Sequence, residues 1–339
     1  MSSTTQYTTF TDLYTGLLRS IRDSTSVTAT VNEAKRAINT ALHDMHMGED
    51  RGAFYWTERR ARIVTAAPYS TGTATIAAAT RTTVAGPSTA WNTTVTGFGV
   101  ANAIAGYKFR VSGQSEVYGI TSVLTDTSLS LADTYTGDAV TDTSYQILVD
   151  EYSLASDFGE PIDERNFSDE WEIPIIGSRE FYRRFPRNVI TGKPRCCTFI
   201  TTGLSGTSVV RKLLFYPVPD NEYSIPYRYV TTNLAVSSAG AAQTQLSADS
   251  DEPIVPLQFR HALIYHALSH WYRDRKDDQR SQEARNEYVD IIRRIRAKTA
   301  PYQDRPQIQI SRARWSQGPG WRRRPRYDVN NWFEELKDR

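Results

Sequence analysis

Residues with the spacing of metal ligands stand at the end of a predicted helix near the N-terminus. His43, Asp44, His46 and Glu49 offer two imidazoles and two carboxylates, and the spacing of three between the histidines allows a shared helical face. No further cluster of ligands accompanies them elsewhere in the sequence. We therefore predict that these four residues do not form a metal site, and we expect neither a metal nor a cofactor.

A second group of histidines lies in the strongest helical pattern of the chain, which begins at Leu257. Among His261, His266 and His270, only the last two have the i, i+4 spacing that aligns side chains on a helix. A zinc-protease helix needs a glutamate directly after its first histidine, and the sequence has none there. We interpret these histidines as packing or interface residues.

Common catalytic patterns do not occur in the sequence. It contains neither the G-x-S-x-G turn of serine hydrolases nor the glycine-rich phosphate loops G-x-x-x-x-G-K-[ST] and G-x-G-x-x-G. Neighbouring carboxylates, as at Asp249 and Asp251 or at Asp277 and Asp278, fall in polar segments that we interpret as solvated surface. A lytic glycosidase would need two carboxylates placed in a cleft, and the sequence indicates no such pair. The sequence therefore predicts a structural or binding protein and not an enzyme.

The end of the chain, SRARWSQGPGWRRRPRYDVNNWFEEL, mixes tryptophans with arginines and lacks a helical or strand period. It could bind nucleic acid, with arginines on phosphates and tryptophans stacked on bases. Alternatively it is an arm that orders on a protein partner, because Trp and Arg dominate interface energetics. The chain has 40 basic and 38 acidic residues, and this balance favours protein anchoring.

The candidate partner-binding residues of this arm comprise expected aromatic anchors and the basic side chains around them. They are Arg312, Arg314, Trp315, Trp321, Arg322, Arg323, Arg324, Arg326, Tyr327, Trp332 and Phe333.

Amphipathic helices are predicted on both sides of a β-rich region. Apolar residues at steps of three and four predict a helix over 10–21, and a second helix is expected to be capped by Thr30 and to end near Gly48. The short polar turn between them indicates an antiparallel hairpin. A late pair begins at Leu257 and is interrupted by the charged segment RDRKDDQR.

The β-rich region over 67–150 has short alternating runs separated by turn residues about every ten residues, which is typical of a small sandwich or barrel. After it, EYSLASDFGEPI and SREFYRRFPRN are interpreted as short helices or turns, and NLAVSSAGAAQTQLSADSDEP as a loop. Strands of a hairpin-rich sheet are predicted for CCTFITT, RKLLFYPVP and SIPYRYVTT.

Together these patterns predict an α+β fold. The N-terminal helix pair and the late helix pair form a helical bundle, which with the hairpin sheet makes a discontinuous body of residues 1–66 and 151–300. A small all-β sandwich or barrel module, residues 67–150, is inserted into it, and residues 301–339 form an extended C-terminal arm.

Cysteine usage and hydropathy indicate the compartment. Cys196 and Cys197 are adjacent, and since a vicinal disulfide is strained, we expect two reduced thiols in a strand of an intracellular protein. No apolar run approaches the roughly 18 residues of a membrane span, and the start MSSTTQYTTF lacks the regions of a signal peptide. We therefore expect a soluble protein, made in a cytoplasm, with no membrane partner.

The order of these parts resembles the head-to-tail adaptor (connector, or head completion) proteins of tailed bacteriophages. The segment GPSTAWNTTVTGFGVANAIAGYKFRVSGQSEVYGITSVLTDTSLSLADTYTGD is similar to β modules of phage virion proteins, with Trp91, the step Gly106-Tyr107 and a Ser-Leu-Ser-Leu strand before Tyr135. The late pair HALIYHALSHWYRDRKDDQRSQEARNEYVDIIRRIRAK resembles the adaptor pattern of an apolar helix, a Lys-Asp-Asp turn and a second helix with a tyrosine.

This resemblance implies a structural protein of the virion neck, between capsid and tail, synthesised in the host cytoplasm. It implies a homo-oligomeric ring, expected to be a dodecamer, that binds the portal protein above and tail or neck proteins below. DNA would pass through the channel without sequence-specific binding, and the arm would reach the portal. Two alternatives stay open: a nucleic-acid-binding protein that uses the Arg/Trp-rich tail, and a tail or neck protein with a binding β module.

Overall fold

The structure is a computed structural model that describes residues 7–23, 25–47, 54–94, 101–186, 188–205 and 208–299. The chain divides into two units, residues 1–295 and 296–339, and of the second only the last turn of a helix is described. Glu49 and the predicted arm, with all eleven candidate partner-binding residues from Arg312 to Phe333, lie outside the described residues.

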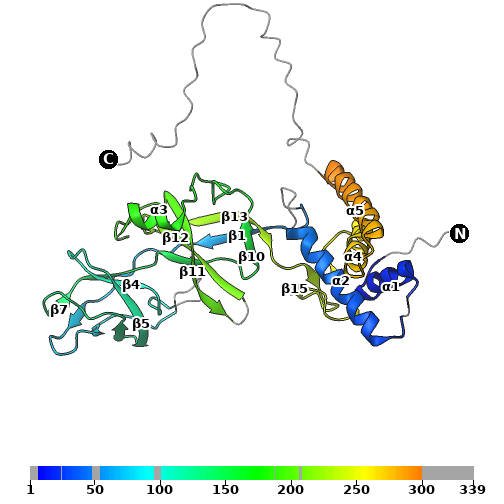
Figure 1. The fold of residues 1–339 in the computed structure, drawn as a ribbon. Helices are drawn as coiled ribbons and strands as arrows, with labels where there is room; N and C mark the ends of the chain where they lie inside the picture. The colour runs from blue at the N-terminus through cyan, green and yellow to red at the C-terminus, as the bar shows by residue number, and fades with distance from the viewer. Residues whose placement is uncertain are drawn as a thin grey trace, which may run out of the picture. The chain divides into compact units, whose positions relative to one another are not determined.

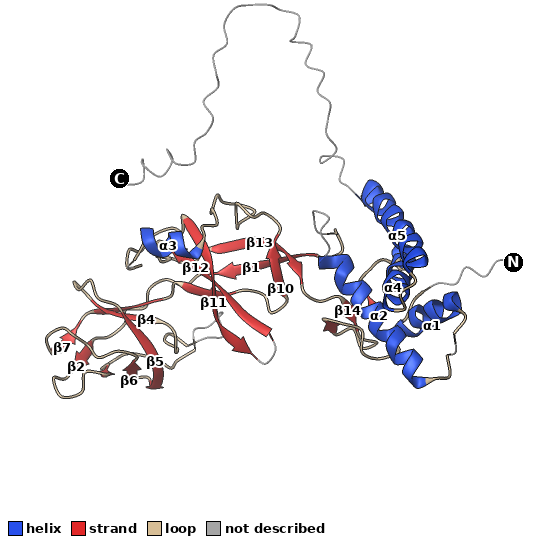
Figure 2. Ribbon diagram, viewed as in Figure 1, coloured by secondary structure: helices blue, strands red, loops and turns tan. Residues whose placement is uncertain are grey.

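Helices from both ends of the chain pack on one apolar core (Figure 1). Their apolar stripes require a partner surface, and each stripe finds it on the other helices. The α+β class is thereby confirmed, because these helices accompany several β-sheets (Figure 2). The helices around this core are α1 (Phe10–Ile21), α2 (Thr28–Met47), α4 (His261–Asp274), which follows a 3₁₀ turn (Leu257–Phe259), and α5 (Asp278–Thr299).

Local hydrogen bonds fix the helix ends. Thr9 and Asp12 form a capping box that starts α1. Thr30 is not the cap of α2, contrary to the prediction: the helix begins at Thr28, and the Val31 N–H donates to the Val27 carbonyl at 3.0 Å. Because the Val27 carbonyl already accepts this first i→i−4 hydrogen bond, Thr30 lies inside the first helical turn and not at the cap position.

The central strands form two antiparallel three-stranded sheets in the orders β1-β13-β10 and β11-β12-β9. Their aromatic and aliphatic side chains fill a second core, which includes Phe167, Phe215 and Tyr227. A short helix α3 (Ser178–Arg184) lies against β11. The strands are β1 (Glu58–Val64), β9 (Glu151–Ser153), β10 (Phe158–Pro161), β11 (Cys196–Ser205), β12 (Ser208–Tyr216) and β13 (Ser224–Thr231).

The β-rich region folds into one seven-stranded antiparallel sheet, a half-barrel, in the order β7-β2-β3-β6-β5-β4-β8. It has a core of its own, in which Trp91 and Tyr135 are fully buried, as predicted for the aromatic residues of this module. Gly106 has φ +93, a value that favours glycine, so it makes the turn before Tyr107. The strands are β2 (Ala74–Ile76), β3 (Thr83–Ala85), β4 (Lys108–Val111), β5 (Tyr118–Thr125), β6 (Ser128–Leu131), β7 (Val140–Thr143) and β8 (Tyr145–Leu148).

Two short segments differ from their predictions. EYSLASDFGEPI forms strands β9 and β10 instead of helices or turns, because β12 and β13 offer sheet edges to which these few residues can pair. The predicted loop 233–253 contains a small sheet of β14 (Ala235–Val236), β15 (Ala242–Gln243) and β16 (Glu252–Pro253). The strands β9 and β10 depend on partners distant in sequence, and the two-residue strands β14, β15 and β16 are too short to show an alternating pattern.

Two further features concern the cysteines and the apolarity of the helices. Cys196 and Cys197 are free, buried thiols at the start of β11. None of the helices that the structure describes combines the length and apolarity needed to span a bilayer.

Candidate functional site

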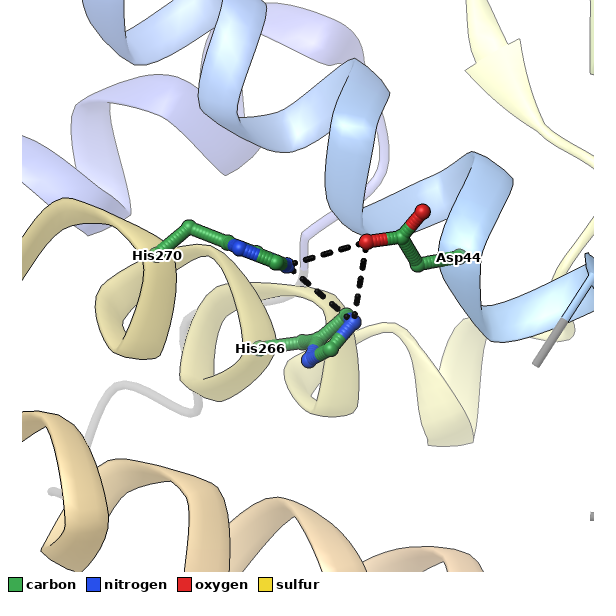
Figure 3. Close-up of side chains that lie close together, drawn as sticks. All are labelled: Asp44, His266 and His270. Carbon is green, nitrogen blue, oxygen red and sulfur yellow. Dashed lines mark hydrogen bonds and ion pairs between the residues drawn. The ribbon is translucent and has the colours of Figure 1, made fainter. Parts of the chain in front are cut away.

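Asp44 of α2 and His266 and His270 of α4 point toward one another (Figure 3). The Oδ2 atom of Asp44 lies 3.2 Å from Nε2 of His270 and 3.9 Å from Nε2 of His266. The two Nε2 atoms are 3.4 Å apart. Two imidazoles and a carboxylate, separated by more than 200 positions in sequence, thus converge on one point between two helices.

Helix geometry explains this convergence. His266 and His270 are one turn apart and therefore share the face of α4 that meets α2. Both helices contribute fully buried alanines to the common core, including Ala41 of α2 and Ala267 of α4. Small side chains allow the two helices to approach closely, which brings the carboxylate within reach of both rings.

Hydrogen bonds assign the tautomer of His270. The guanidinium of Arg273 lies 2.8 Å from Nδ1 of His270 and can only donate, so Nδ1 accepts. Nε2 therefore carries the proton of the neutral ring and donates it to Asp44. The carboxylate side chain is 42% exposed, so solvent reaches this side of the cluster.

His266 is held differently. Its ring stacks on Tyr288 of α5 with centroids 4.1 Å apart. Its Nδ1 is buried, with no hydrogen-bond partner among the described residues. The interpretation as a packing residue is therefore confirmed for His266, which packs on Tyr288, but it misses the common approach of His266 and His270 to Asp44.

Both rings are neutral near pH 7. Burial, and secondly the nearby His270, lower the pKa of His266 to about 4, while Asp44 opposes this shift. Burial, followed by the charge of Arg273, also lowers the pKa of His270. Neutral imidazoles keep a lone pair, so the cluster can accept a metal ion or share a proton.

The histidines of the N-terminal stretch do not form a site together. Nδ1 of His46 lies 2.7 Å from the Leu42 carbonyl and its Nε2 accepts from the Trp56 indole at 3.2 Å, so both nitrogens are engaged. His43 is exposed, with Nδ1 3.7 Å from the other oxygen of Asp44. Of that stretch, only Asp44 joins the cluster.

The carboxylates predicted to be solvated surface are of two kinds. Asp249 is exposed and pairs with Lys35 at 2.5 Å. Asp251, by contrast, is buried, and its Oδ2 accepts from the backbone N–H groups of Ala248 at 2.7 Å and Ser247 at 2.8 Å. The surface interpretation of Asp251 was therefore wrong, because the side chain folds back into its own turn.

Sequence comparison adds the family. No curated protein matches the chain. Among the described residues, we recognise no catalytic constellation. The fold combines helices from two segments distant in sequence with a β module. Residues 113–316 match the model of the family described as "SU10 adaptor protein", and because the match covers more than half of the chain, the chain belongs to this family of phage head-tail adaptors.

The family confirms the resemblance predicted from the order of the parts. It identifies a structural adaptor protein of the phage virion, consistent with a protein that is not an enzyme. The matched region includes His266 and His270, whereas Asp44 precedes it.

Proposed function

We propose that this chain assembles into a homo-oligomeric ring, a dodecamer, that joins the capsid portal to the tail and gives passage to DNA. The observation that carries the proposal is membership of the phage head-tail adaptor family. The ring binds the portal protein on one side and tail or neck proteins on the other. DNA passes through without sequence-specific binding.

A closed ring requires two different faces on each subunit that complement one another. Exposed aromatic and aliphatic side chains on separate elements support such faces: Tyr55 is 53% exposed, Tyr182 on α3 52% and Ile190 56%. Tyrosine is enriched in interfaces because it combines a large apolar ring with a hydroxyl.

The body and the inserted module have separate tasks in this proposal. The discontinuous body of residues 1–66 and 151–300 builds the ring, and the module of residues 67–150 offers a surface to neighbouring virion proteins. The separate cores of the helices and of the β module support this division. The arm of residues 301–339 reaches the portal, with Trp315, Trp321, Trp332 and Phe333 as anchors.

Incubation of the purified full-length chain with purified portal particles tests the proposal. Electron microscopy of the mixture should show an added ring of one copy per portal subunit. A variant that ends at Pro301 should keep the circular-dichroism spectrum of the folded body and lose attachment. A full-length chain that stays a monomer and ignores portal particles would contradict the proposed function.

A further inference from the structure

We propose that Asp44, His266 and His270 bind a divalent transition-metal ion of the zinc class, which cross-links α2 to α4. The proposal concerns the helical core and does not depend on ring formation. It rests on the donor atoms, on the distances between them and on their access to solvent.

The donor set suits such an ion. Imidazole nitrogen and carboxylate oxygen are ordinary zinc ligands, and two histidines one helical turn apart with one carboxylate make a three-ligand set. Each of Asp44, His266 and His270 offers one such atom, and all three atoms lie within 4.8 Å of one another. This is the sole group of its kind in the part of the chain that the structure describes.

The distances also fit. A tetrahedral zinc ion with bonds of about 2.0–2.1 Å holds its ligand atoms about 3.3–3.4 Å apart. The two edges at His270 measure 3.2 Å to Asp44 and 3.4 Å to His266, so they already have this length. The third edge, between Asp44 and His266, is 3.9 Å and must close by about half an ångström. A small rotation of the exposed carboxylate achieves this.

Metal binding replaces the proton now shared by His270 and Asp44. When Nε2 of a neutral histidine binds a metal, the ring proton resides on Nδ1. Arg273, which donates to this Nδ1, must therefore turn away, and its side chain is 63% exposed and free to enter solvent. Water can supply a fourth ligand, because solvent reaches the Asp44 side of the cluster.

The surroundings of His266 limit the affinity of the proposed site. His266 Nδ1 lacks an acceptor among the described residues, and a missing partner of this kind costs about 10- to 100-fold in metal affinity. Binding is therefore expected to be weaker than in a closed structural zinc site whose histidines all have such acceptors. The proposed role of the ion is structural: it cross-links α2, which precedes the β module in sequence, to α4, which follows it.

The test uses the full-length chain without an affinity tag, after dialysis against a chelator. Titration with Co²⁺ should produce the visible d–d absorption of a tetrahedral ion that saturates at one per chain. Zn²⁺ should displace it and raise the melting temperature. Asp44→Asn and His270→Gln should each weaken Zn²⁺ binding by at least about tenfold. The control variant His261→Gln, which removes a histidine of α4 outside the cluster, should bind as the wild type does.

Absence of the Co²⁺ bands in the wild type would overturn the proposal. Equal Zn²⁺ binding by His270→Gln and the wild type would overturn it too. Circular dichroism shows whether the two ligand variants fold. If one of them does not fold, the Co²⁺ spectrum and stoichiometry of the wild type, compared with those of His261→Gln, still decide the question.

Discussion

Asn39 of α2 and Leu246 share two hydrogen bonds: the Asn39 side-chain amide donates to the Leu246 carbonyl at 2.9 Å, and its oxygen accepts from the Leu246 N–H at 3.0 Å. The bonds attach the segment before α4 to an N-terminal helix 207 positions away. Asn39→Ala leaves both backbone groups of Leu246 without these partners and should lower the free energy of unfolding by about 2–3 kcal/mol.

Urea unfolding followed by circular dichroism measures this loss. Asn32→Ala, at an exposed position of the same helix, is the matched control and should change stability by less than about 0.5 kcal/mol. Similar losses in both variants would show that the side-chain bonds contribute nothing beyond helix propensity.

The core of the β module depends on a buried tryptophan and its hydroxyl partner. The Trp91 indole donates to the Tyr145 hydroxyl at 2.8 Å, and this hydroxyl donates to the Thr71 carbonyl at 2.6 Å. Tyr145→Phe removes the acceptor of a buried N–H and should cost about 1–3 kcal/mol. Tryptophan fluorescence during thermal unfolding reports the change, and Tyr182→Phe at an exposed site should leave the transition where it is.

Asp251 gives the fold an acid-sensitive contact. Hydrogen bonds from the backbone of Ala248 and then of Ser247 lower its pKa. A carboxyl whose pKa is lowered on folding contributes stability above its unfolded pKa of about 3.9, and this stability is lost as the pH falls through the folded pKa. Asp251→Asn should therefore destabilise the protein by about 1–3 kcal/mol at pH 7.

The difference between wild type and Asp251→Asn should shrink as the pH falls below about 4. Denaturant unfolding at several pH values measures it. Asp249→Asn, which removes one exposed ion pair with Lys35, should cost at most about 1 kcal/mol. A pH-independent difference would rule out the ionised carboxylate as the source of the stability.

Arg260 joins the N-terminal segment to the start of α4. The guanidinium is buried and donates to the carbonyls of Thr8, Val255 at 2.8 Å and Pro253 at 3.1 Å, and to the carboxylate of Glu252 at 3.1 Å. Lysine cannot reach several acceptors in this planar arrangement, so Arg260→Lys should cost about 2–4 kcal/mol. Thermal unfolding checks this against Arg36→Lys, an exposed exchange expected to be neutral.

Variants of the arm, residues 301–339, distinguish protein anchoring from DNA binding. Combined Trp315→Ala, Trp321→Ala and Trp332→Ala should abolish portal attachment, because buried aromatic side chains carry interface energy. Replacement of Arg322, Arg323 and Arg324 by glutamine should weaken attachment by a smaller factor. Pull-down with portal particles measures both variants.

DNA binding by the same arm is measured in parallel at several salt concentrations. Tight binding of the wild type with a steep salt slope, lost with the arginines, would favour the nucleic-acid-binding alternative over the portal.

Local patterns in the sequence indicated the helices and some of the strands, among them β11, β12 and β13. The apolar steps of 10–21 set α1 residue for residue, and the charged RDRKDDQR separates α4 from α5, because amphipathic periodicity and helix breaks depend on neighbouring residues. The order of the parts was also sufficient to indicate the adaptor family. The pairing of β9 with β12 and of β10 with β13 was not predictable from the local sequence, because each pair joins segments distant in sequence.

The cluster of Asp44, His266 and His270 was decided by tertiary structure alone. The sequence shows the i, i+4 spacing of the two histidines, but the carboxylate comes from α2, which precedes the whole β module in sequence. The burial of Asp251 was hidden in the same way, because its environment depends on how the turn folds. Residue spacing fixes which side chains share a helical face, whereas the packing of helices distant in sequence fixes what that face meets.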